Sequence, residues 1–117
     1  MPDEKADAAY LWDMLDAARA ILDFTRGADL AAYRREPMMR RAVERELEIV
    51  GEAAAHVSES FRAAHQEIPW RSVVGLRNVL IHAYGQVDDA RVWKVVVDHL
   101  PTMIRDLTPL LPPEPGS

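Results

Sequence analysis

The chain has 117 residues, 49% of them hydrophobic, which is enough for one domain with a real core and too few for two. It contains no cysteine, which excludes a disulfide framework and a cysteine-rich zinc site and fits a reducing cytoplasm. The net charge of −5 argues against a protein that coats nucleic acid through bulk positive charge, so any nucleic-acid contact must be local.

The N-terminal stretch "MPDEKADAAY" is acidic and has no hydrophobic signal core, and no apolar run is long enough to cross a bilayer. We therefore expect a cytoplasmic protein that does not associate with a membrane. Residues 1–111 are predicted to form one helical domain. The proline-rich end "PPEPGS", residues 112–117, is predicted to be a disordered tail.

The first predicted helix runs from Asp7 to Gly27, where glycine is a natural C-terminal stop. Its apolar residues recur at the three-and-four spacing of one helix face. Asp29 can then cap a short helix or ordered turn that must end by Pro37, because the residue before proline resists the helical region. A second helix, with Pro37 in its first turn, follows directly.

Further along the chain, "SESFRAAHQEIP" breaks the helical period, and Pro69 with Trp70 can open a third helix that stops near Gly85. A fourth helix is expected to begin at Asp88 or Asp89. We expect Pro101 to kink or break it before the apolar pattern resumes.

All long apolar patterns have helical period, so the sequence predicts an all-α protein, an antiparallel bundle of four to five helices. "WKVVVDHL" is the one β-branched cluster, and the helical spacing around it outweighs its strand propensity. The predicted core positions are Leu11, Met14, Leu15, Val43, Leu47, Val50, Val73, Leu76, Leu80, Val92 and Val96.

Several familiar chemistries lack their signatures. A carboxylate-bridged metal site in a bundle needs Glu-x-x-His pairs, yet no histidine here has a glutamate three residues before it. Glu52 and His56 share a helix face, which indicates a solvated contact rather than a pair of metal ligands. No glycine-rich phosphate loop follows a strand, and no serine has the setting of a nucleophile. We expect neither a metal nor a cofactor.

The segment "RNVLIHAYG", residues 77–85, concentrates polar side chains at one helix end. At about 100° per residue, Arg77 and Tyr84 lie within about 20° of one another, and Asn78 and His82 are neighbours on an adjoining face. Arginine supplies a forked donor for phosphate oxygens, and histidine donates or accepts protons near neutrality. The alternative is structural, with Arg77 paired to an acid and Tyr84 packed in the core.

The segment "GLRNVLIHAYGQVD" resembles the Arg-polar-x-x-x-His-x-Tyr signature of HEPN domains, specifically the HepT type of toxin found beside a small nucleotidyltransferase antitoxin of the MntA type. "RELEIVGEAA" is similar to the helix that precedes the signature in that family, and "IPWRSVVGLRN" and "VWKVVVDHLP" are similar to its flanks. The resemblance covers the chain from about Met39 to Leu107.

The resemblance implies a helical bundle that forms a homodimer and acts as a metal-independent endoribonuclease toxin. Arg77, Asn78 and His82 match the motif's catalytic positions, and Tyr84 matches the tyrosine to which the antitoxin transferase attaches AMP. The dimer also has a chemical motive, because transesterification needs both a base and an acid while each chain offers one motif histidine.

The best local candidates for RNA binding are three arginines of the second helix, Arg40, Arg41 and Arg45. They can equally form a solvated face balanced by neighbouring glutamates. Two other functions also stay open: a non-catalytic module that holds a nucleotide or phosphate for a partner nucleotidyltransferase, and a scaffold that binds a partner through exposed helices.

Overall fold

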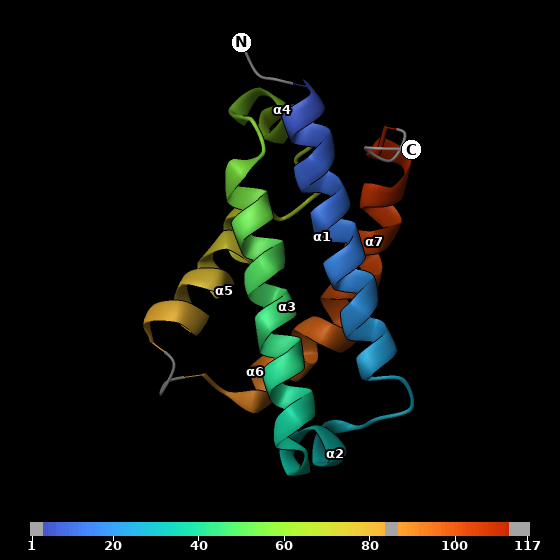
Figure 1. The fold of residues 1–117 in the computed structure, drawn as a ribbon, viewed down its shortest axis with the longest axis vertical. Helices are drawn as coiled ribbons and strands as arrows, with labels where there is room; N and C mark the ends of the chain where they lie inside the picture. Colours follow the sequence, from blue (N-terminus) through green and yellow to red (C-terminus); the bar gives the residue numbers. More distant parts are fainter. Residues whose placement is uncertain (1–3, 84–86, 113–117) are drawn as a thin grey trace.

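The computed structural model describes residues 4–83 and 87–112, and every regular element in these ranges is helical. The long helix α1 (Glu4–Phe24) is followed by a second long helix, α3 (Pro37–His56), which lies beside it (Figure 1). α5 (Trp70–His82) packs against α3, and α7 (Leu100–Leu107) packs against α1. No strand occurs within the described ranges, which confirms the prediction of an all-α bundle.

The first two connections follow the predicted turn chemistry. Gly27 has a φ of 76°, the left-handed conformation that glycine adopts without a steric penalty after a helix. Asp29 caps the short helix α2 (Leu30–Arg35), because its carboxylate accepts a hydrogen bond of 2.8 Å from the Ala32 amide. α3 then begins at Pro37, as predicted.

A further short helix, α4 (Glu59–Ala64), lies in the segment where the sequence shows no helical period. Ser58 caps it through a hydrogen bond from the Phe61 amide to its hydroxyl group. Asp7 of α1 accepts hydrogen bonds from the amide and the hydroxyl group of Ser58, at 2.8 and 2.7 Å. These bonds fasten the start of α4 to the N-terminal part of α1.

The last helical run passes Pro101 without stopping. α6 (Asp89–Lys94) continues into a π-helical turn, Val95–His99, and then into α7. In the π-helical turn the Leu100 amide donates to the Val95 carbonyl group, five residues back. Proline has no amide hydrogen to donate, so the wider turn before it accommodates a residue that would interrupt a regular α-helix.

The predicted core positions are buried, with exposures of 8% or less, except for Val73. Val73 is partly buried and packs against the edge of the core. Tyr33 of α2 is fully buried, and its ring centroid lies 5.4 Å from that of Trp93. This contact closes the end of the bundle where α2 meets α6.

The C-terminal end of the described chain returns to α1, where the Trp12 indole donates a 3.0 Å hydrogen bond to the Pro112 carbonyl group. The rest of the predicted tail, residues 113–117, lies outside the described residues. None of the helices in the described ranges is long and apolar enough to cross a bilayer.

Candidate functional site

The candidate site forms where α5 crosses α3 at Gly51. Gly51 is buried, and a Cβ atom added to it would overlap the Cβ of Arg77 and lie 3.0 Å from the Val73 carbonyl oxygen. Only a residue without a side chain permits this approach of the two helices. The glycine therefore brings Arg77 directly onto the surface of α3.

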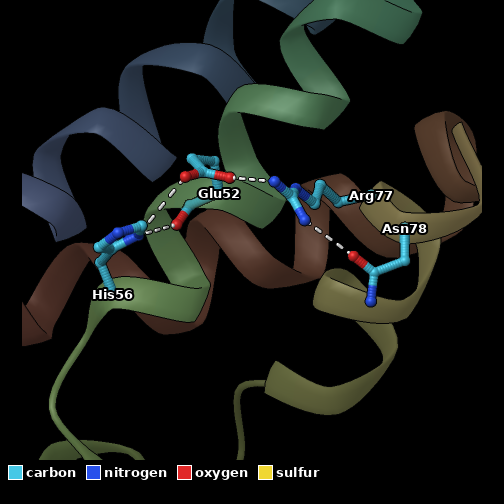
Figure 2. Close-up of polar contacts among 4 residues, drawn as sticks. All are labelled: Glu52, His56, Arg77 and Asn78. Carbon is cyan, nitrogen blue, oxygen red and sulfur yellow. Dashed lines mark hydrogen bonds and ion pairs between the residues drawn. The ribbon is translucent and has the colours of Figure 1, made fainter. Parts of the chain in front are cut away.

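The Arg77 guanidinium group is held by two partners from different helices (Figure 2). Its Nη2 lies 2.6 Å from Glu52 Oε2 on α3, and its Nη1 donates a 2.9 Å hydrogen bond to Asn78 Oδ1 on α5. Its Nε is buried and has no hydrogen-bond partner among the described residues. With 27% of the side chain exposed, the group is fixed in direction but open to solvent on one side.

Glu52 lies between Arg77 and His56, as Figure 2 shows. The Nδ1 atom of His56 is 2.8 Å from the Glu52 carbonyl oxygen and 3.8 Å from its carboxylate. Both side chains are about half exposed, which agrees with the predicted solvated contact on one helix face. Within residues 4–83 and 87–112, no group of three or more histidine, aspartate or glutamate side chains is arranged to hold a metal ion.

A groove of about 530 Å³ lies in front of Arg77, between α1, α3 and α5. Its charged lining residues are the cations Arg45 and Arg77 and the carboxylates of Asp13, Glu48 and Glu52. We call it the Arg77 groove. Because the carboxylates offset the arginines, the groove as a whole is not a basic surface.

His82 is the last residue of α5, and its side chain is exposed. It does not appear among the described residues that line the Arg77 groove. Residues five apart on an α-helix point about 140° away from one another, so Arg77 and His82 of one chain face different directions. The structure joins Arg77 and Asn78 by a hydrogen bond, whereas His82 faces away from Arg77. Tyr84 lies outside the described residues.

The three candidate arginines of α3 have different surroundings. Arg40 donates to the carbonyl groups of Tyr33, at 3.3 Å, and of Arg34, so it closes the C-terminal end of α2. Arg41 is exposed. Arg45 is exposed and lines the Arg77 groove. Among the three, Arg45 is the one placed beside the motif arginine.

The description "Ribonuclease HepT-like" belongs to the family model that matches residues 14–110, and the chain therefore belongs to the HepT-like ribonuclease family. "Probable ribonuclease HepT" of Thermococcus cleftensis is 38% identical over 94 residues, which cover 80% of this chain and 86% of that protein. "Putative RNase MJ1380" of Methanocaldococcus jannaschii is 37% identical over 99 residues, covering 85% of this chain and 91% of that protein.

A third relative, "Putative RNase TTE0752" of Caldanaerobacter subterraneus subsp. tengcongensis, is 28% identical over 110 residues, with 94% of this chain and 98% of that protein covered. No solved structure matches this chain. The family expected from the segment around Arg77 is thus confirmed by proteins that match along most of the chain.

The alternative in which Arg77 pairs with an acid did not identify Glu52 as that acid, and the sequence analysis missed Gly51 altogether. Gly51 interrupts a helix of otherwise good helix formers, and an isolated glycine inside a helical pattern is the signal of a close approach. For Glu52 the sequence holds no such signal, because its partner Arg77 belongs to another helix and meets it only through the crossing.

Proposed function

We propose that this chain is a metal-independent endoribonuclease that cleaves RNA through attack by the RNA's own 2′-hydroxyl group. The observation that carries the proposal is the guanidinium group of Arg77, which two partners hold in place and which is partly exposed to solvent, in a chain of the HepT-like ribonuclease family. A preset cation that faces solvent is suited to a phosphate whose negative charge increases in the transition state.

In the proposed reaction the 2′-oxygen forms a bond to phosphorus while the bond from phosphorus to the 5′-oxygen breaks. The 2′-hydroxyl proton passes to a base, and the leaving 5′-oxygen receives a proton from an acid. His82 moves these protons, Arg77 stabilises the charge on the five-coordinate phosphorus, and Asn78 holds Arg77 in position. The products are a 2′,3′-cyclic phosphate and a 5′-hydroxyl end.

A homodimer is part of the proposal, with an interface that brings two copies of residues 77–84 together. Within one chain, Arg77 and His82 point about 140° apart on α5, so one chain does not direct both at a single phosphate. In a dimer, His82 of the second copy can face the phosphate bound at Arg77 of the first. The dimer also has two motif histidines, one for the base and one for the acid.

The experiment compares Arg77→Ala, His82→Ala and wild type on labelled single-stranded RNA in the presence of a chelator. We expect each substitution to abolish cleavage while thermal unfolding stays nearly unchanged, because both side chains lie at least partly in solvent. Wild type should yield 2′,3′-cyclic phosphate ends. A substituted protein that cleaves normally would remove that residue from the mechanism.

We further propose that the protein is the toxin of a pair, neutralised by a nucleotidyltransferase that attaches AMP to Tyr84. A bulky anionic group there would compete with RNA phosphate for Arg77. Incubation with the cognate transferase, ATP and magnesium should add the mass of AMP to wild type and not to Tyr84→Phe. If the adduct forms on another residue, or if the transferase silences Tyr84→Phe equally well, Tyr84 is not the switch.

One observation favours a non-catalytic alternative, in which the chain binds a nucleotide or scaffolds a nucleotidyltransferase. The 2.6 Å ion pair with Glu52 already neutralises Arg77, as expected for an arginine whose role is structural. Binding of nucleotide without RNA cleavage by wild type would support this alternative.

A further inference from the structure

A second groove, of about 700 Å³, lies where the loop after α4 meets the first turns of α5, and Asn78 is one of its lining residues. Its polar side chains are those of Arg62, Gln66, Arg71, Ser72 and Asn78. We call it the α4–α5 groove. Of these residues the proposed chemistry uses Asn78 alone, and the candidate arginines of α3 do not line this groove.

The charge of the α4–α5 groove is unusual for a chain with a net charge of −5. Among the described residues that line it there are two arginines and no carboxylate. The Arg77 groove, in contrast, contains the carboxylates of Asp13, Glu48 and Glu52. A polyanion that reaches Arg77 therefore meets repulsion along one groove and attraction along the other.

Asn78 connects the α4–α5 groove to Arg77. A guanidinium group has only donors, so the Asn78 amide must present its oxygen to Arg77 Nη1, and they lie 2.9 Å apart. The amide nitrogen then points away from Arg77, as Figure 2 shows. Because Asn78 lines the groove, this nitrogen is a donor for a phosphate oxygen next to the one at Arg77.

The two arginines of the groove have donors to spare. Arg62 is partly buried and lines the groove, and its Nε, which is itself buried, has no hydrogen-bond partner among the described residues. Arg71 is exposed in the first turn of α5, which contains no acidic residue. A phosphate in the groove would pair with the guanidinium group of either arginine.

We propose that the α4–α5 groove holds the backbone of single-stranded RNA next to the cleaved bond, with Arg62 and Arg71 on adjoining phosphates. This assignment rests on the proposed ribonuclease function, because it takes the cleaved phosphate to lie at Arg77. A single strand is the expected form, since its backbone can bend into a groove of this size and an A-form duplex cannot.

The test measures binding separately from cleavage. The probe is a fluorescein-labelled mixed-sequence strand of about 12 nucleotides, a length within the usual range of single-strand sites. Its riboses carry 2′-fluorine, so it lacks the attacking hydroxyl group. Anisotropy titrations at several salt concentrations give the Kd and its salt dependence for each protein.

We expect Arg71→Gln to weaken binding about fivefold at moderate salt and to reduce the slope of log Kd against log salt by about 0.7, the value for one lost phosphate contact on a single strand. Arg62→Gln should act in the same direction, with urea unfolding as the check on its fold. Arg105→Gln on α7 is the charge-matched control, because Arg105 is exposed and lines neither the α4–α5 groove nor the Arg77 groove. It should leave the Kd and its salt dependence unchanged.

The proposal is overturned if wild type does not bind the strand, if Arg71→Gln binds like wild type, or if Arg45→Gln is the variant that weakens binding. Unmodified RNA separates this result from the enzyme proposal. A wild type that binds the fluorinated strand in an Arg71-dependent way but leaves RNA uncut supports the groove and refutes the ribonuclease. Cleavage by Arg71→Gln with an unchanged KM supports the ribonuclease and refutes the groove.

Discussion

Glu52 offsets the charge of Arg77, and in the proposed enzyme it would set how much of that charge a substrate meets. Its carboxylate lies 2.6 Å from Nη2, and the two side chains are 52% and 27% exposed. A pair this open contributes little to stability, about 1 kcal/mol or less. We expect its larger effect to be on direction, because the ion pair favours one orientation of the guanidinium group.

The variant Glu52→Gln tests this positioning role. Glutamine keeps the size and one oxygen acceptor but loses the charge, so we expect kcat to fall about tenfold while KM stays the same or falls, since Arg77 becomes a stronger but less ordered phosphate ligand. The measurement is steady-state RNA cleavage with urea unfolding alongside. Unchanged kinetics would mean that Glu52 does not position Arg77.

Gly51 offers a second test at the residue scale. Gly51→Ala places a methyl group against the Cβ of Arg77, so we expect the free energy of unfolding to fall by about 1–3 kcal/mol, the usual cost of overpacking. Gly75→Ala is the matched control on α5: its Cβ would meet nothing within 4 Å. The control should gain up to about 1 kcal/mol in stability from helix propensity.

Urea unfolding of the two glycine variants gives the comparison directly. Equal stabilities for Gly51→Ala and Gly75→Ala would contradict the close crossing of α3 and α5. The pair is informative because the same chemical change is made twice, once between two helices and once on an open face.

The sequence predicts the positions of Arg77 and Asn78 better than it predicts their neighbour Glu52, which comes from another helix. Arg77 and Asn78 are adjacent in a recognisable segment, so their proximity follows from one helix. The ion pair with Glu52 depends on the register between α3 and α5, which helical periodicity within either helix does not contain. A tertiary contact of this kind can be found only once the packing is known.

At the scale of elements, the contact between Asp7 and Ser58 is the tie that holds α4 against α1. Asp7 is 8% exposed and accepts two hydrogen bonds from Ser58. We expect Asp7→Ala to lower the free energy of unfolding by about 2–3 kcal/mol, because it leaves a partly buried amide without an acceptor. Asp7→Asn keeps one acceptor oxygen and should cost less.

Urea unfolding with both Asp7 variants checks the prediction. If Asp7→Ala and wild type unfold at the same urea concentration, the contact between Asp7 and Ser58 contributes nothing to the free energy of unfolding. Hydrogen exchange gives a local readout, since amides of α4 should exchange faster in Asp7→Ala while those of α3 keep their protection.

The long helices with a buried apolar face were predicted from the sequence, whereas the short helix α4, which contributes only the partly buried Phe61 to the core, was missed. α1, α3 and α5 carry apolar residues at helical spacing, and their core positions follow from it. α4 has no buried residue, so no apolar period marks it, and its cap at Ser58 is the only local sign. At Pro101 the expected kink takes the form of a π-helical turn, after which α7 runs in a different direction from α6 (Figure 1). A residue pattern does not specify this form.

At the scale of the whole molecule, the proposed homodimer predicts that an inactive copy silences its wild-type partner. If cleavage needs the His82 side chains of both copies, one as base and one as acid, a hybrid of His82→Ala and wild type lacks one of them and is inactive. With random exchange of subunits, an equal mixture should show about a quarter of the activity of the same total amount of wild type, instead of the half expected for independent copies.

The measurement is RNA cleavage after the two proteins have been co-refolded, with light scattering to give the mass of the particle. Each protein refolded alone is the control. A mixture that keeps half of the wild-type activity would show that the His82 side chains of different copies do not act together, and a monomeric mass in a fully active protein would remove the dimer.

The α4–α5 groove, basic in a chain of net charge −5, has a consequence for the timing of encounters. At a distance the molecule repels a polyanion, and only within about a Debye length, near 8 Å at physiological ionic strength, does the local positive field dominate. If the α4–α5 groove binds RNA as proposed, we expect RNA to associate slowly and from few directions. Most encounters with nucleic acid should then end without binding, and the strands that bind should be those that approach this one face.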